Sequence, residues 1–234
     1  MASGSQTASS NIDNAATRTI VSTLGVLLGV SSINHGLPEV LQGNHSTPGL
    51  FVKALGPGHQ WTVWTQGSEP AFTLIPNFLL TGILATLFGV LLIICSRLLI
   101  HRPYGPSVFL LLSISSFLTG GGLAQVLLFT LNWAAATRIH GSLSIWRRLV
   151  PKSARPALGK FWRWPLVVGT VAFLAALEIA IFGYILGVPG RPEVLRGILV
   201  QLGFVIVISF LASFLCGFAH DIEGHAASRQ ECLP

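Results

Sequence analysis

Residues 106–137 read PSVFLLLSISSFLTGGGLAQVLLFTLNWAAAT. The stretch carries no charged residue and is interrupted only near its centre, by the three consecutive glycines at 120–122. A single helix of this length would reach roughly 48 Å, whereas the hydrocarbon core of a bilayer is about 30 Å thick. The stretch is too long for one level crossing and too short for two, so its path decides on which side of a membrane the neighbouring loops lie.

The whole chain has the composition of a multi-span membrane protein. Of its 234 residues, 51% are hydrophobic and only 9% are charged, whereas about 25% of the residues of a soluble domain are charged. We expect disordered polar tails at 1–18 and 226–234, on either side of one membrane-embedded domain at 19–225. The pattern predicts an all-α, polytopic transmembrane helix bundle with spans at residues 19–41, 71–100, 106–137, 165–186 and 195–219.

Two topologies are compatible with this pattern. If 106–137 crosses once, there are five spans, with nine Lys and Arg on the cytoplasmic side and five outside. If it dips in and returns at the glycines, there are four spans plus a re-entrant hairpin, and the count becomes eleven against three. A re-entrant tip, however, leaves backbone amides unpaired unless protein or water covers them. On that ground we expect five spans, with the re-entrant hairpin as the alternative.

Half of the Lys and Arg lie between residues 138 and 163. Basic loops beside spans are usually cytoplasmic, so the loop at 138–164 is placed on that side of an integral membrane protein, in the cell membrane rather than an organelle. Tryptophans interleave with the charges, which is typical of a segment lying on anionic headgroups and not of a nucleic-acid site. The expected lipid contacts are Arg147, Arg148, Lys152, Arg155, Lys160 and Arg163.

Four polar residues near the ends of two expected spans could form a metal or proton site. His35 and Glu39 lie four residues apart on the first span, and His220 and Asp221 end the fifth. In the five-span topology these ends share one side of the membrane, so a His/carboxylate cluster could form and bind a divalent metal. In the four-span topology the two pairs lie on opposite sides. The alternative is that all four simply meet water at helix ends, and Pro38 is expected to kink or stop the first span.

Glu178 is an acid near the middle of the expected fourth span, where insertion costs about 2.5–3.5 kcal/mol. It is read either as an ion- or proton-coupling site or substrate contact, with Asn77 and Asn132 as further candidates for substrate or ion binding, or as a structural residue. In the structural reading its carboxyl group forms a hydrogen bond to Asn77, Asn132, Gln125 or a serine on a facing helix. Gln125 and Gln201 also lie in apolar stretches, where interhelical hydrogen bonding is the usual reason for a polar residue.

Three classes of function remain open. The first is a non-catalytic accessory or assembly protein with a membrane-protein partner or a second copy of itself. The second is a small ion- or proton-coupled transporter or channel that uses Glu178 and the His/carboxylate cluster. The third is a membrane enzyme acting on a lipid or quinone with a metal at that cluster; it is disfavoured because the sequence has no catalytic motif spacing. No cofactor other than such a metal is predicted.

Overall fold

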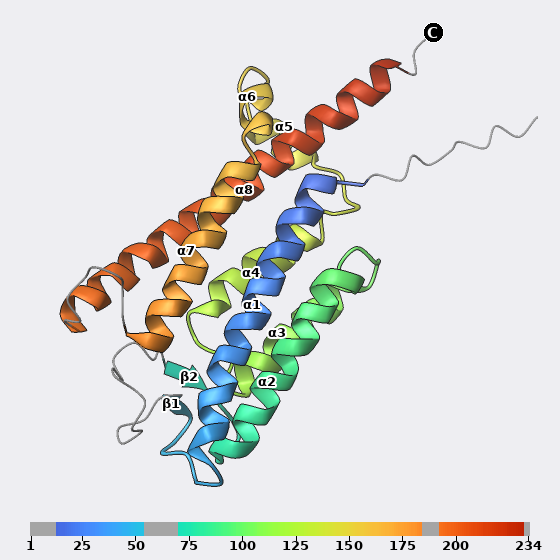
Figure 1. The fold of residues 1–234 in the computed structure, drawn as a ribbon. Helices are drawn as coiled ribbons and strands as arrows, with labels where there is room; N and C mark the ends of the chain where they lie inside the picture. Colours follow the sequence, from blue (N-terminus) through green and yellow to red (C-terminus); the bar gives the residue numbers. More distant parts are fainter. Residues whose placement is uncertain (1–12, 54–69, 184–191, 232–234) are drawn as a thin grey trace, which may run out of the picture.

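The structure is a computed structural model that describes residues 13–53, 70–183 and 192–231 (Figure 1). It is mostly helical, with one small antiparallel sheet at one end of the bundle. The elements in chain order are α1 (Ala15–Gln42), β1 (Phe51–Lys53), β2 (Pro70–Phe72), α2 (Phe78–Ile94), the π-helix η2 (Cys95–Leu99), α3 (Gly105–Leu118), α4 (Gln125–Ala136), α5 (Ser144–Leu149), α6 (Arg155–Lys160), α7 (Arg163–Phe182) and α8 (Pro192–Glu231).

Four helices in the described ranges are long and apolar enough to cross a membrane, judged by length and composition. They are Ala15–Gln42, Phe78–Leu99, Arg163–Phe182 and Glu193–Ala227. Their outward faces carry large exposed apolar side chains, as lipid contact requires. The fold class expected from composition, a helical membrane bundle, is therefore supported at this level.

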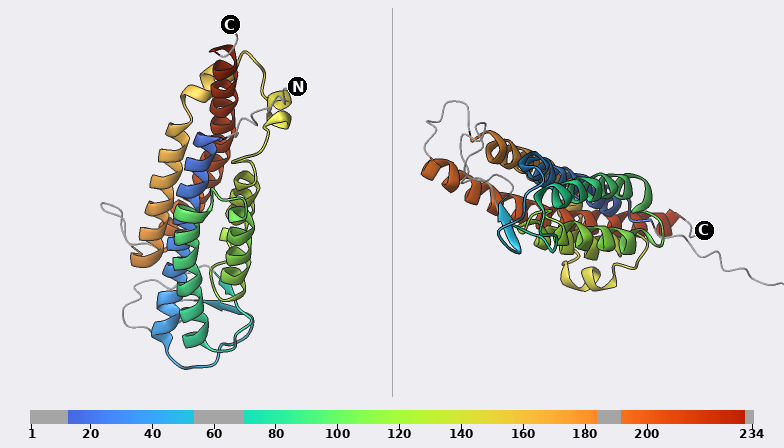
Figure 2. Two further views of the ribbon diagram at one scale, coloured as in Figure 1. Left: turned by 90° about the vertical axis from the view of Figure 1, so that its right-hand side faces the viewer. Right: turned by 90° about the horizontal axis from the view of Figure 1, so that it is seen from below.

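The single long helix expected over residues 106–137 is wrong. α3 ends at Leu118 and α4 begins at Gln125, and the two run in opposite directions as a hairpin (Figure 2). Gly120 and Gly122 adopt φ angles of 95° and 94°, which side chains other than glycine rarely adopt. The two ends of the hairpin meet at the same end of the bundle, where His140 Nε2 lies 2.5 Å from the carbonyl oxygen of His101.

The backbone of the glycine turn is hydrogen-bonded to β2 and the residues after it. The Gly120 amide donates to the carbonyl oxygen of Phe72 at 2.9 Å, and the Leu123 amide donates to the carbonyl oxygen of Pro70 at 3.1 Å. In the other direction, the Leu74 amide donates to Leu118 at 3.0 Å. The objection to a re-entrant tip was its unpaired backbone amides. Here the turn pairs with β2 and the residues after it, which were expected from the sequence to begin the second span.

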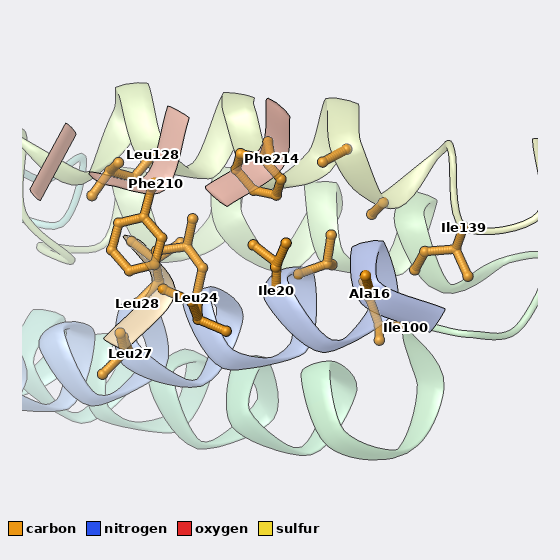
Figure 3. Packing of buried hydrophobic residues seen from close by; sticks show 14 of the residues in the cluster. Ala16, Ile20, Leu24, Leu27, Leu28, Ile100, Leu128, Ile139, Phe210 and Phe214 are labelled. Carbon is orange, nitrogen blue, oxygen red and sulfur yellow. The ribbon is translucent and has the colours of Figure 1, made fainter. Parts of the chain in front are cut away.

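α1 is the central helix of the bundle. In its most apolar window 61% of the residues are buried, against 39%, 28% and 22% for the other three long helices. Apolar side chains of α1 interdigitate with those of α4 and α8, as Figure 3 shows for Ile20, Leu24, Leu28, Phe210 and Phe214. Any polar group on the inner face of α1 is therefore enclosed by several helices at once.

Small residues allow α1 and α2 to touch backbone to backbone. A methyl group added to Gly29 would lie 2.6 Å from the Gly89 carbonyl oxygen, and one added to Gly89 would lie 2.7 Å from the Gly29 oxygen. Gly36 and Gly82 face each other in the same reciprocal way, with both distances 2.6 Å. Such close approach depends on glycine and favours weak backbone contacts between helices.

Two helix starts differ from the expected spans. The span predicted at 71–100 begins only at Phe78, because the residues before it pair in the sheet, and the Asn77 side chain caps α2 by accepting from the Leu80 amide at 3.1 Å. The first span begins at Ala15, inside the tail that was expected to be disordered to residue 18.

Helix ends differ as well. α1 runs through Pro38 without stopping, since the proline lies close to the end of the helix. α7 ends at Phe182, four residues before the predicted end, on a left-handed Gly183 cap whose amide donates to Ile179 at 2.9 Å. α8 continues to Glu231, so residues 226–231 of the predicted tail are helical; 1–12 and 232–234 lie outside the described residues.

Candidate functional site

One carboxylic acid is completely enclosed near the end of α1. The Glu39 side chain is 0% exposed, and His35, one turn earlier, is 7% exposed. Because α1 continues unbroken through Pro38, their spacing places both side chains on one face of the helix. Among the described residues, neither carboxylate oxygen of Glu39 has a hydrogen-bond partner. A buried carboxylate without a partner is costly, so a proton or a cation must compensate it.

The Glu39 side chain is covered by the glycine turn of the α3–α4 hairpin and by α2. A methyl group on Gly120 would lie 2.6 Å from Oε2 and 2.9 Å from Oε1, so the turn rests directly on the carboxyl group. From the other side, a methyl group on Gly82 would lie 2.9 Å from the Glu39 Cβ. Position 120 requires glycine for two reasons, its positive φ angle and its contact with the Glu39 carboxyl group.

A buried hydrogen-bond network lies about two turns before Glu39 along α1. The Ser32 and Ser116 hydroxyls are 2.8 Å apart, and Gln125 Nε2 donates to Ser31 Oγ at 2.9 Å. Gln125, the first residue of α4, also donates from its side chain to the carbonyl of Gly121 in the glycine turn. This network ties the hairpin to α1 and gives Gln125 the interhelical role predicted for it.

A second polar group lies farther along the contact between α1 and α4. Asn132 and Ser96 are both 0% exposed, and within the described residues neither the Asn132 amide atoms nor Ser96 Oγ has a hydrogen-bond partner. Both side chains lie against Gly25: a methyl group there would be 3.2 Å from Asn132 Nδ2 and would collide with Ser96 Oγ. Buried polar groups of this kind are usually satisfied by water or a ligand.

The structure does not bring His220 and Asp221 to His35 and Glu39. Asp221 of α8 instead caps the start of α1, accepting from the Ala16 and Thr17 amides at 3.0 Å each and from the Thr17 hydroxyl at 2.7 Å. This place is roughly 33 Å along α1 from Glu39 at 1.5 Å per residue.

His220 also lies at that opposite end, where its Nδ1 is 3.1 Å from the Gly159 carbonyl of α6. The four-residue metal cluster expected from the sequence is therefore not assembled, and no group of three or more His, Cys, Asp or Glu suited to a metal occurs in the described ranges.

The residues proposed to surround Glu178 lie in separate places. Glu178 is exposed on α7, and because the helix ends at Phe182 it is one turn from the end, not near the middle. Asn77 caps α2, with its Nδ2 donating to Asn44 at 2.7 Å, and Asn132 lies deep beside α1. Gln201 is exposed on α8 rather than bonded inside the bundle.

The basic segment forms two short helices, α5 and α6, at the end of the bundle where α1 begins. Trp146 packs on Phe218 of α8 with ring centroids 4.7 Å apart, which anchors the segment to α8. Arg155 donates to the carbonyls of Val150, at 3.1 Å, and of Arg147. The other predicted lipid-contacting side chains point outward and are exposed: Arg147, Arg148, Lys152, Lys160 and Arg163.

No family model, curated protein or solved structure matches this chain. The class that the fold and composition define is a helical protein whose described ranges contain four helices long and apolar enough to span a membrane.

Proposed function

We propose that α1, α2, α7 and α8 cross the membrane and that α3 and α4 form a re-entrant hairpin between them. The lengths support this topology: at 1.5 Å per residue α3 and α4 reach about 21 and 18 Å, short of a bilayer core of about 30 Å. The hydrogen bonds of the glycine turn to β2 remove the main energetic objection, because the turn exposes few unpaired amides.

The charges support a cytoplasmic location for the end of the bundle that holds the start of α1 and the end of α8. Lys53 in β1 and Arg196 near the start of α8 lie toward the opposite end of the bundle (Figure 1). The cytoplasmic end carries the basic segment on anionic headgroups, together with the side chains of Arg18, Arg97, Arg102 and Arg138.

Within this topology, we propose that the protein is a small proton-coupled membrane transport protein whose proton site is Glu39. The observation that carries the proposal is a fully buried carboxyl group without a hydrogen-bond partner in the described residues, pressed against a broken hairpin. Ionisable residues inside membrane bundles usually mark ion or proton pathways, and broken helices commonly line such sites in transporters. A proton fits better than a metal ion, since three metal ligands do not gather in the described chain.

Polar side chains follow one another along the α1–α4 contact, from Glu39 toward the cytoplasmic end of the bundle. Glu39 lies near the non-cytoplasmic end of α1, followed toward the cytoplasm by the Ser32–Gln125 network and then by Asn132 and Ser96. In a bundle that is otherwise apolar at its centre, these groups offer positions at which water could relay a proton. His35, one turn from Glu39, is the nearest second proton acceptor on α1.

The test is proton flux into liposomes that contain the purified protein and a trapped pH-sensitive dye, driven by an imposed pH and potassium gradient. We expect Glu39→Gln, which keeps the shape of the side chain and cannot ionise, to reduce the flux to that of empty liposomes. The matched control is Glu178→Gln, an exposed acid on α7, which we expect to leave the flux unchanged. Equal flux with and without wild-type protein, or an undiminished rate in Glu39→Gln, refutes the proposal.

A second candidate, a non-catalytic accessory subunit, is supported by the exposure of Glu178. It lies on a helix whose outward face is otherwise apolar, with Val171, Leu174 and Ile181 exposed nearby. Acids on membrane helices usually pair with another polar group, which here would come from a second subunit. Native mass spectrometry from mild detergent tests this: loss of a bound subunit in Glu178→Ala supports it, and an unchanged mass, or a wild-type protein that is already monomeric, refutes it.

A further inference from the structure

A polar pocket lies at the cytoplasmic end of the bundle, between α1 and the end of α2, about one helix length from Glu39. Its volume is 380 Å³, and it is open to the outside. The side chains that give it its chemistry are Arg18, Thr19, Ser22, Ser96, Arg97 and His101. None of them lies beside Glu39, although Ser96 also belongs to the polar path proposed above, and the inference rests on the membrane orientation proposed there.

One wall of the pocket is made by the π-helical turn η2. The Ile100 amide donates to the Cys95 carbonyl five residues earlier at 2.8 Å, in place of the usual four-residue spacing. This wider turn and the two residues after it supply Ser96, Arg97, Ile100 and His101 to the lining.

The lining is positively charged and rich in hydroxyl groups. Arg18 is paired with Asp13 at 2.9 Å, at the surface. Arg97 is exposed, and it forms no ion pair with any acid in the described part of the chain. Ser96 is 0% exposed; the residue contributes to the lining, while its hydroxyl lies against Gly25 of α1 and has no hydrogen-bond partner among the described residues. The lining therefore offers one guanidinium without an acid partner in the described chain, together with hydroxyl-bearing residues.

Planar guanidinium groups and hydroxyl donors are the groups that proteins use to bind phosphate oxygens. The position points to a lipid as the source of that phosphate. The pocket opens where α1 begins and a candidate span ends; the last residue of α2, Ile94, precedes the pocket residues on the membrane side and is 43% exposed, and Leu98 of η2 is 62% exposed beside them. A phosphate in the pocket would thus lie at headgroup height with an apolar surface beside its acyl chains.

We propose that this pocket is a binding site for the phosphate group of an anionic phospholipid. A single uncompensated arginine matches the single negative charge of a phosphodiester headgroup such as that of phosphatidylglycerol. The site differs from the diffuse contacts of the basic segment, because it is a concave site with hydroxyl donors and not an exposed charged surface.

The test is native mass spectrometry of the full chain in detergent, titrated with phosphatidylglycerol, phosphatidylcholine or inorganic phosphate. We expect one tightly bound phosphatidylglycerol, and an affinity about tenfold lower for phosphatidylcholine and for the Arg97→Gln variant, since a hydrogen bond to a charged group typically contributes that much. Ser22→Leu, which fills the pocket without removing a charge, should weaken binding by a similar factor.

The matched control is Arg102→Gln, an exposed arginine outside the pocket. We expect its affinity for phosphatidylglycerol to stay within about twofold of wild type, because its charge only adds to a screened surface potential. Equal weakening in Arg97→Gln and Arg102→Gln, or unweakened binding in Ser22→Leu, overturns the proposal in favour of diffuse surface attraction. Tighter binding of inorganic phosphate than of phosphatidylglycerol overturns the assignment to a lipid.

Discussion

The same substitution, glycine to alanine, should change stability in opposite directions at two helical positions. At Gly29 the added methyl group would lie 2.6 Å from the Gly89 carbonyl oxygen and 3.1 Å from the Ile93 amide nitrogen, both backbone atoms of α2. Because a backbone carbonyl cannot rotate out of the way, α1 and α2 must move apart along their contact. At Gly203 of α8 the methyl group would meet no atom within 4 Å.

The magnitudes follow from these contacts. Overpacking against a rigid backbone costs about 3 kcal/mol at the upper end of the usual range, and the better helix propensity of alanine returns about 1 kcal/mol. Gly29→Ala should therefore lower the free energy of unfolding by about 2 kcal/mol. Gly203→Ala has only the propensity term and should raise it by about 0.5–1 kcal/mol.

The assay is equilibrium unfolding by sodium dodecyl sulfate in dodecyl maltoside micelles, followed by far-ultraviolet circular dichroism. Both proteins differ from wild type by one methyl group, so effects of detergent binding largely cancel in the comparison. If Gly29→Ala is as stable as Gly203→Ala, the close contact of α1 with α2 does not exist in solution, and the enclosure of Glu39 between them is also in doubt.

Substitutions at Asp221, Gly120 and Gln125 test the contacts around the hairpin and the start of α1, by the same unfolding assay. Asp221→Ala leaves two buried amides and one hydroxyl without their acceptor and should lower the free energy of unfolding by about 3 kcal/mol. Asp221→Asn should lower it by about half as much. A loss below about 0.5 kcal/mol for both variants, on the order of measurement error, would exclude the cap. Gly120→Ala combines a positive φ with a collision at the Glu39 carboxylate and should cost about 2–3 kcal/mol, which wild-type stability would contradict. Gln125→Leu should cost about 1–3 kcal/mol and Gln201→Leu less than about 0.5 kcal/mol, and equal costs would argue against the buried network.

Local sequence signals predicted the helical elements well and the long-range contacts poorly. The apolar runs located α1, α2, α7 and α8, because an apolar run is a property of a single segment. The path of residues 106–137 depends on residues far away in the sequence. The glycine turn is feasible because its backbone pairs with residues 70–74, and no pattern inside the turn reveals this pairing.

The candidate site divides in the same way. The i, i+4 spacing of His35 and Glu39 was readable from the sequence, whereas the contact of Glu39 with Gly120 depends on how the hairpin returns. Asp221 was grouped with Glu39 because the five-span topology put both at one end; it instead caps the start of α1 at the other end. The sequence shows only that Asp221 follows the end of an apolar run, and this does not reveal which end of α1 it contacts.

The path of the hairpin is the claim on which the site and the topology both depend, and labelling of single cysteines tests it directly. Cysteines at Tyr104, Ser142 and Ser46, each exposed, are introduced into a chain whose native cysteines are replaced and treated with an impermeant maleimide in intact and inverted vesicles. The account predicts that positions 104 and 142 are labelled from the same side and position 46 from the other. Labelling of 104 and 142 from opposite sides would mean that residues 106–137 cross the membrane once and that the glycine turn does not cover Glu39.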